Sequence, residues 1–210
     1  MTNSKPDTRS KAPMRERVLD AAERLLAGSG AAFSMRQLAE EAGVSFATPF
    51  NQFGSKAAIM LALSARRIAA MNARLAEAGL PESAPERVLA AIDIATAVML
   101  EAPAVNRLFM GAISAPSEET GDVSSHSAAL WTAAVGSGDG LIAASRPLAL
   151  AVLPTQLAVA FRGVLSFWAA GEIPDDALNR STRAAAATVL LGFVAPDKRG
   201  DLLALIGQTH

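Results

Sequence analysis

Hydrophobic residues recur every three to four positions along most of this chain, a spacing that predicts amphipathic helices. Near the N-terminus, Val18, Ala22 and Leu25 would share one face of a first helix, which Gly28 and Gly30 bring to an end. No segment alternates polar and apolar residues in the way that a half-buried strand does. The pattern therefore predicts an all-α protein.

Capping signals divide the next segment into three more helices. Ser34 and Gln37 form a capping box for a second helix, and Ser45 and Ser55 are the expected N-caps of a third and a fourth. Only a short turn separates the second helix from the third, and Gly43 within it can adopt the positive φ that a sharp turn needs. This is the spacing of a helix-turn-helix, which lays one helix in the major groove of DNA.

The remaining sequence continues as helices separated by short breaks. A second capping box, Ser83 with Glu86, opens one of them, and a kink is expected near Pro154. Arg146 and Arg162 bracket the most apolar run too closely for a membrane span, so we interpret it as a buried core helix. The expected helices cover about 55–78, 83–103, 104–114, 124–136, 147–170 and 176–195.

Composition narrows the class of protein. A chain of 210 residues can form one or two domains with a substantial core. It contains no cysteine, which excludes disulfides and thiolate metal sites and suits a reducing cytoplasm. The polar N-terminus has no apolar segment of the signal-peptide kind. We expect a cytoplasmic protein with no metal, no cofactor and no membrane partner.

Charge is distributed unevenly along the chain. Residues 1–67 carry 10 basic and 6 acidic residues, a net charge of +4, whereas residues 68–210 carry 9 and 14, a net charge of −5. A basic head on an acidic body favours nucleic-acid binding at one end. Chance clustering of surface charge is the alternative explanation.

The run from Arg17 to Lys56 resembles the TetR family of bacterial transcriptional repressors. The positions that carry the resemblance are Ala21, Ala22, Leu25, Leu26, Gly30, Ser34, Leu38, Ala39, Ala42, Gly43, Val44, Ser45, Thr48, Phe50, Phe53, Ser55 and Lys56. The resemblance implies a flexible tail at 1–13, a DNA-binding domain at 14–56, and a helical effector-binding and dimerisation domain at 57–210. It further implies a homodimeric repressor that a small molecule releases from a palindromic duplex operator.

Contacts with DNA are carried over from the resemblance position by position. Arg36 would reach a base edge, since a guanidinium can take O6 and N7 of guanine together. Phe50 stands where relatives usually have Tyr, so a hydroxyl that would bind phosphate is missing. Pro49 replaces a usual Leu, which predicts either a short third helix or Thr48 as its effective cap. The predicted DNA-contacting residues are Ser34, Arg36, Ser45, Phe46, Ala47, Thr48, Phe50, Gln52 and Lys56.

In the body, large or polar side chains on otherwise alanine-rich helices are candidates for a ligand pocket, although such residues often simply form core. The ligand candidates are Met99, Arg107, Phe109, Met110, His126, Trp131, Phe161, Arg162 and Trp168. The family places its dimer interface on the last two long helices, whose apolar surplus should pack against a second copy. The interface candidates are Leu165, Trp168, Val189, Leu190 and Phe193.

Catalysis is not expected. His126 stands among serines, but the chain has no nucleophile elbow, no P-loop and no metal-spaced His or Cys set. Two alternatives to the ligand-released repressor stay open at this point. One is a DNA-binding regulator without an effector, and the other is an α-helical enzyme or carrier in which the head is only a scaffold.

Overall fold

The computed structural model describes residues 13–29, 33–114 and 123–208, and this part of the chain is helical, with a single isolated bridge between Leu141 and Val194. The predicted tail, apart from Pro13, and most of the predicted loop at 115–123 lie outside the described residues. The helices are α1 (Met14–Ser29), α2 (Met35–Ala42), α3 (Ala47–Phe53), α4 (Lys56–Glu77), α5 (Ala84–Leu100), α6 (Pro103–Ser114), α7 (Val123–Val135), α8 (Arg146–Ala169), α9 (Asp175–Leu190) and α10 (Arg199–Gly207). The all-α prediction is confirmed.

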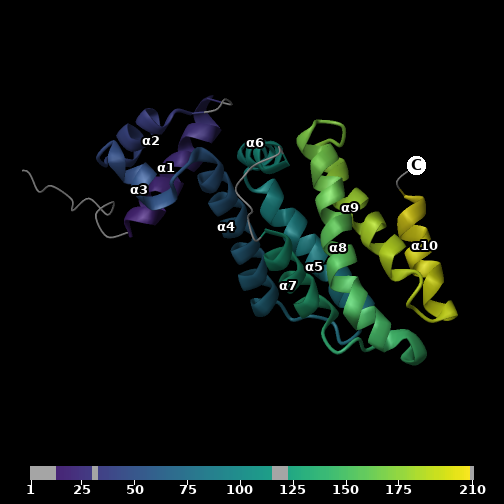
Figure 1. The fold of residues 1–210 in the computed structure, drawn as a ribbon. Coiled ribbons are helices and arrows are strands. Elements are labelled where there is room, and N and C mark those ends of the chain that lie inside the picture. The colour runs from purple at the N-terminus through teal and green to yellow at the C-terminus, as the bar shows by residue number, and fades with distance from the viewer. Residues whose placement is uncertain (1–12, 30–32, 115–122, 209–210) are drawn as a thin grey trace, which may run out of the picture.

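Helices α1 to α3 form a head at one end of the molecule, and α4 leads from the head along the side of a larger helical body (Figure 1). The predicted faces are the buried ones: Val18, Ala22 and Leu26 of α1 pack with Leu38 of α2 and Ile59 of α4. Because the first turns of α4 complete the head's core, the head and the body share one continuous helix.

The body is built around α8, which packs on α7, α6 and α9. This helix is long and apolar enough to cross a membrane by length and composition alone. Its Leu153, Leu157 and Phe161 are nevertheless buried within the protein, which fits a central core helix. Pro154 lies inside α8, is buried, and does not end the helix.

Two local predictions differ from the structure. Ser83 precedes α5 as expected, but its side chain makes no capping hydrogen bond. Pro85 has no N–H to offer, and the amide of Ala84 donates instead to the carbonyl of Asp139 at 2.7 Å. In addition, α9 ends at Leu190, a few residues earlier than predicted.

The chain then forms α10, a helix that the sequence pattern did not predict, and α10 packs on α9. Apolar residues occupy several sides of this short helix, so no single apolar face marks it in the sequence. Leu202 is 3% exposed, whereas its neighbour Leu203 is 53% exposed. Leu202 therefore makes the most buried contact between α10 and the core, and Leu205 and Ile206 pack there while partly buried.

This arrangement predicts unequal costs for the same substitution at adjacent positions. Leu202→Ala should lower the free energy of unfolding by about 2–5 kcal/mol, because it removes buried methyl groups and leaves a cavity. Leu203→Ala should change it by no more than about 0.5 kcal/mol. Urea denaturation followed by circular dichroism measures both, and equal costs would mean that α10 is not docked as described.

Candidate nucleic-acid interface and body cavity

The helix-turn-helix has the predicted local geometry. The Ser34 hydroxyl accepts a hydrogen bond from the amide of Gln37 at 3.2 Å, and the Gln37 side chain accepts one from the Ser34 amide at 2.8 Å. Gly43 adopts φ 63° and ψ 42°, the left-handed conformation, and its N–H donates to carbonyls at the end of α2. The capping box and the glycine turn are therefore confirmed.

Helix α3 is only seven residues long, as the proline predicted. Pro49 is buried in its first turn, where a missing N–H costs little. The alternative, Thr48 as the cap, is wrong, because Thr48 lies inside the helix. Phe46 occupies the position before α3 and makes no capping bond, while the Ser45 hydroxyl is hydrogen-bonded to that of Thr48 at 2.8 Å. Ser45, the predicted N-cap, therefore lies one residue before the N-cap position, and its hydroxyl connects the turn to the first turn of α3.

Two phenylalanines project from this end of the molecule. Phe46 is 59% exposed and Phe50 is 43% exposed, and their rings meet edge to face with centroids 5.6 Å apart. Exposed aromatic pairs are unusual on a surface that meets only water. The remaining predicted DNA-contacting residues also reach the surface, with Thr48 and Lys56 partly buried and Ser34, Arg36, Ser45, Ala47 and Gln52 exposed.

The positive charges of the head have distinct surroundings. The Arg36 side chain is 81% exposed and forms an ion pair with Glu40 at 3.4 Å. Lys56 lies over the ring of Phe33 at 4.9 Å, and partial burial lowers the pKa of its ammonium group. Arg15, which was not among the predicted contacts, lies over the ring of Phe53 in α3 at 4.7 Å.

Other basic residues of the head have structural roles. Arg17 donates to the carbonyls of Ala42 and Gly43 at 3.0 and 3.1 Å, which ties α1 to the turn. Arg24 pairs with Glu41 at 2.5 Å. The net charge of the head thus overstates the positive surface that DNA could meet.

An ion network joins α1 of the head to α4. Arg66 contacts Glu16 at 2.5 Å, Asp20 at 2.8 Å and Glu23 at 3.4 Å, three carboxylates on one face of α1. Burial lowers the pKa of Arg66, but its hydrogen bonds to Glu16 and Asp20 outweigh burial, and the pKa is raised overall. Arg67 contacts Glu23 at 3.2 Å.

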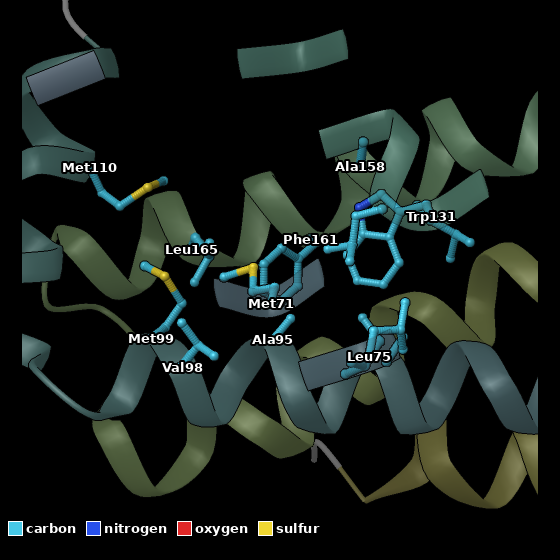
Figure 2. Close-up of a cluster of buried hydrophobic side chains, with 14 of the residues drawn as sticks. Met71, Leu75, Ala95, Val98, Met99, Met110, Trp131, Ala158, Phe161 and Leu165 are labelled. Carbon is cyan, nitrogen blue, oxygen red and sulfur yellow. The ribbon is translucent and has the colours of Figure 1, made fainter. Parts of the chain in front are cut away.

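The body contains a cavity of about 340 Å³ between α4, α5, α6, α7 and α8, within the size range of small-molecule sites. Among the predicted ligand residues, Met99, Phe109, Met110, Phe161 and Arg162 line it. Figure 2 shows Met99, Met110 and Phe161 in the same apolar cluster as Met71 and Leu165. Lining residues that the sequence reasoning missed include Ser64, Arg67, Ile68 and Met71 of α4, Ser125, Ser127, Ala128 and Leu130 of α7, and Thr155, Ala158, Val159 and Leu165 of α8.

The other ligand candidates are placed elsewhere. Arg107 lies over the ring of Trp168 at 4.8 Å, and both side chains donate hydrogen bonds to Asp175, at 2.9 and 2.7 Å. That cluster ties α6, α8 and α9 together. Trp131 is buried and contacts Phe161 edge to face at 5.3 Å, so it lies behind the lining rather than in it. His126 is exposed on the first turn of α7.

The predicted dimer residues need correction. Trp168 and Leu190 are 0% exposed, so they belong to the core of a single chain and cannot supply a contact surface. Leu165 is also buried, and Val189 and Phe193 are partly buried. The periodic pattern marked an apolar face correctly but did not show that one chain covers it by itself. The large exposed apolar residues of α8 are Leu148, Leu150, Val159 and Phe167.

Within the described ranges, no group of three or more His, Asp or Glu side chains is arranged to hold a metal ion.

Comparison with known proteins points to one family. Residues 18–63 match the sequence profile of bacterial regulatory proteins of the tetR family. The fold resembles that of a TetR transcriptional regulator from Rhodococcus sp. RHA1, with 22% identity and a TM-score of 0.66 over 84% of this chain and 96% of that one. A protein of unknown function from the same organism is 27% identical, with a TM-score of 0.55 over 91% of this chain and 100% of that one. No curated protein matches the sequence.

The exposed Phe50 ring yields a prediction for any DNA complex of this surface. Phe50→Tyr adds a hydroxyl at a position already open to solvent, where it can donate to a phosphate. The substitution should tighten binding to a duplex by about 0.5–1.5 kcal/mol, the usual gain from one hydrogen bond. Fluorescence anisotropy with a labelled duplex measures the gain, and Phe53→Tyr, on a partly buried ring of the same helix, is the control. Unchanged affinity would show that the Phe50 edge does not face the backbone of DNA.

Proposed function

We infer that this chain, a member of the TetR family of DNA-binding transcriptional regulators, acts as a homodimeric repressor that a small molecule releases from a palindromic operator. The observation that carries the proposal is the combination of an exposed, short reading helix in the head with a mostly apolar cavity beside α4, the helix that the head and the body share. We further propose that residues 14–56 are the DNA-binding unit, that residues 57–210 bind the effector and the second copy, and that the protein works in the cytoplasm.

In the proposed complex, α3 lies in the major groove and the start of α4 faces the backbone. Phe46 and Ala47 would contact thymine methyl groups, and Arg36 would reach a guanine. Lys56 stands at the N-terminus of α4, where an ammonium and the helix dipole both favour a phosphate. Ser34, Ser45, Thr48, Phe50 and Gln52 would complete the contact surface.

The cavity supports the effector part of the proposal. Four of its lining residues come from α4, the same helix whose first turns form part of the head's core. A ligand that prefers one position of α4 would shift the two heads relative to each other and thereby lower operator affinity. The rival regulator without an effector predicts that no ligand changes operator binding.

Exposed apolar residues support the dimer part of the proposal. Leu148 is 58% exposed and Phe167 is 54% exposed, and both are on α8, away from its buried face. Burying such side chains against a second copy about a two-fold axis would remove apolar surface from water. A dimer would also set two reading helices about 34–36 Å apart, one turn of DNA.

Selection of bound sequences from random duplex DNA tests the DNA-binding role and yields the operator. On the selected site, Arg36→Ala should cost on the order of 1–3 kcal/mol and relax preference at one base position. Lys56→Ala should weaken all sequences about equally and reduce the dependence of log affinity on log salt. Arg74→Ala, on α4 but paired with Glu101 in the body, is the matched control and should bind like the parent. An Arg36→Ala variant with parental specificity would refute the assignment of the reading surface.

The dimer is tested by Phe167→Glu. The charge is solvated in a monomer but would be buried beside its own copy in the proposed interface, so the variant should sediment as a folded monomer and lose tight operator binding. Leu203→Glu places the same charge at an exposed leucine on α10 and should leave both properties unchanged. Tight binding of the full operator by a monomeric Phe167→Glu variant would contradict the dimer proposal.

A further inference from the structure

Arg67 takes part both in the lining of the body cavity and in the ion network with the head. Its side chain lines the body cavity, and its guanidinium also pairs with Glu23 of the head at 3.2 Å. Only 17% of the side chain is exposed, so this cation is largely shielded from water. A single residue therefore connects the interior of the cavity to α1 of the head.

A buried amide holds Arg67 on its other side. The Nε of Arg67 donates to the side-chain oxygen of Asn106 at 2.9 Å, and the Asn106 side chain donates to the carbonyl of Met99 at 2.6 Å. Asn106 is 0% exposed, and Met99 also lines the cavity. The guanidinium is thus fixed in orientation, with Glu23 as its anionic partner.

The contact between Arg67 and Glu23 is an ion pair without a hydrogen bond, unlike the contact between Arg67 and Asn106. The Glu23 Oε1 is buried and lies 3.2 and 3.4 Å from the guanidinium groups of Arg67 and Arg66, yet it accepts no hydrogen bond from the described residues. A buried carboxylate oxygen without a hydrogen bond is poorly compensated for the loss of water. Another carboxylate that formed true hydrogen bonds with Arg67 would therefore compete well with Glu23.

The lining defines the chemistry of such a competitor. The described lining residues include two arginines, Arg67 and Arg162, and no Asp or Glu. Burial lowers the pKa of the Arg162 guanidinium. Most of the remaining wall is apolar, and Met71, Met99 and Met110 contribute flexible side chains that adapt to an elongated ligand (Figure 2).

We propose that the cavity takes an apolar molecule bearing one carboxylate, and that Arg67 binds this carboxylate in competition with Glu23 of the head. The inference rests on the proposed function, because it names the chemistry of its effector. Ligand binding then weakens the tie between α4 and α1 at Glu23, while Arg66 keeps its contacts with Glu16 and Asp20. The head is loosened from the body without being detached.

The first test needs no DNA. Octanoate and decanoate are titrated into the full chain by isothermal calorimetry, with 1-octanol and 1-decanol as uncharged controls of the same length. The carboxylates should bind at least about tenfold more tightly than the alcohols, because a buried guanidinium forms charge-assisted hydrogen bonds. Arg67→Gln should abolish this preference, whereas Arg74→Gln on the same helix should preserve it.

The second test uses the competitor itself. Glu23→Gln removes the charge that the ligand must displace, so decanoate should bind this variant about three- to tenfold more tightly, as reciprocal coupling requires. Asp20→Asn is the matched control, since Asp20 pairs with Arg66 and lies outside the cavity. It should leave decanoate affinity unchanged. With the selected operator, decanoate should weaken DNA binding of the parent more than that of Glu23→Gln.

Three results would overturn the proposal: equal binding of acids and alcohols, no binding of either series, or loss of the preference in Arg162→Gln but not in Arg67→Gln. If Arg67→Gln does not fold, the comparison of Glu23→Gln with Asp20→Asn still decides the matter, and equal decanoate affinities would refute the competition. Because the titrations contain no DNA, their failure leaves operator recognition standing. Failure of the operator selection would instead refute the proposed function and leave the ligand affinities unaffected.

Discussion

The ion network between α1 and α4 is the contact on which the rest of the structure depends. Two neighbouring arginines on α4 hold carboxylates spaced along one face of α1, and Arg67 continues to Asn106 in α6. The network lies where α4 passes from the head to the body. The two guanidinium groups are largely shielded from solvent, so the carboxylates of α1 help to compensate the burial of their charge. The orientation of the head therefore follows from a few charged groups as well as from apolar packing.

Local signals predicted the head well. A capping box, a left-handed glycine and a proline in a first turn each depend on interactions within a few residues. A short segment of sequence is therefore enough to predict them. The same holds for the existence of most body helices. Helix α10 is hard to predict from the sequence because Leu202 is its one fully buried residue in the structure, while Leu205 and Ile206 are only partly buried against the core, and this leaves no clear apolar face.

The cavity and the interface could be predicted only in part. Large side chains on alanine-rich helices predict Met99 and Phe161 as lining residues. Arg67 and Met71 are on α4, whose sequence indicates only a connecting helix, and their place in the cavity depends on the helices packed around it. The family resemblance and the apolar surplus of the last two long helices predict Leu190 and Trp168 in a dimer interface, but one chain buries both. Periodicity cannot tell whether the same chain or a second copy covers an apolar face.

The exposed pair of phenylalanines on the head has a thermodynamic consequence for the proposed DNA complex. The surface proposed to bind DNA presents Phe46 and Phe50 in edge-to-face contact, with Arg36 and Lys56 nearby in sequence. If α3 meets DNA as proposed, removing these rings from water makes the heat capacity of association more negative. The affinity for DNA would then depend on temperature as well as on ionic strength. Each complex would release fewer counterions than one whose contacts were all made by cations.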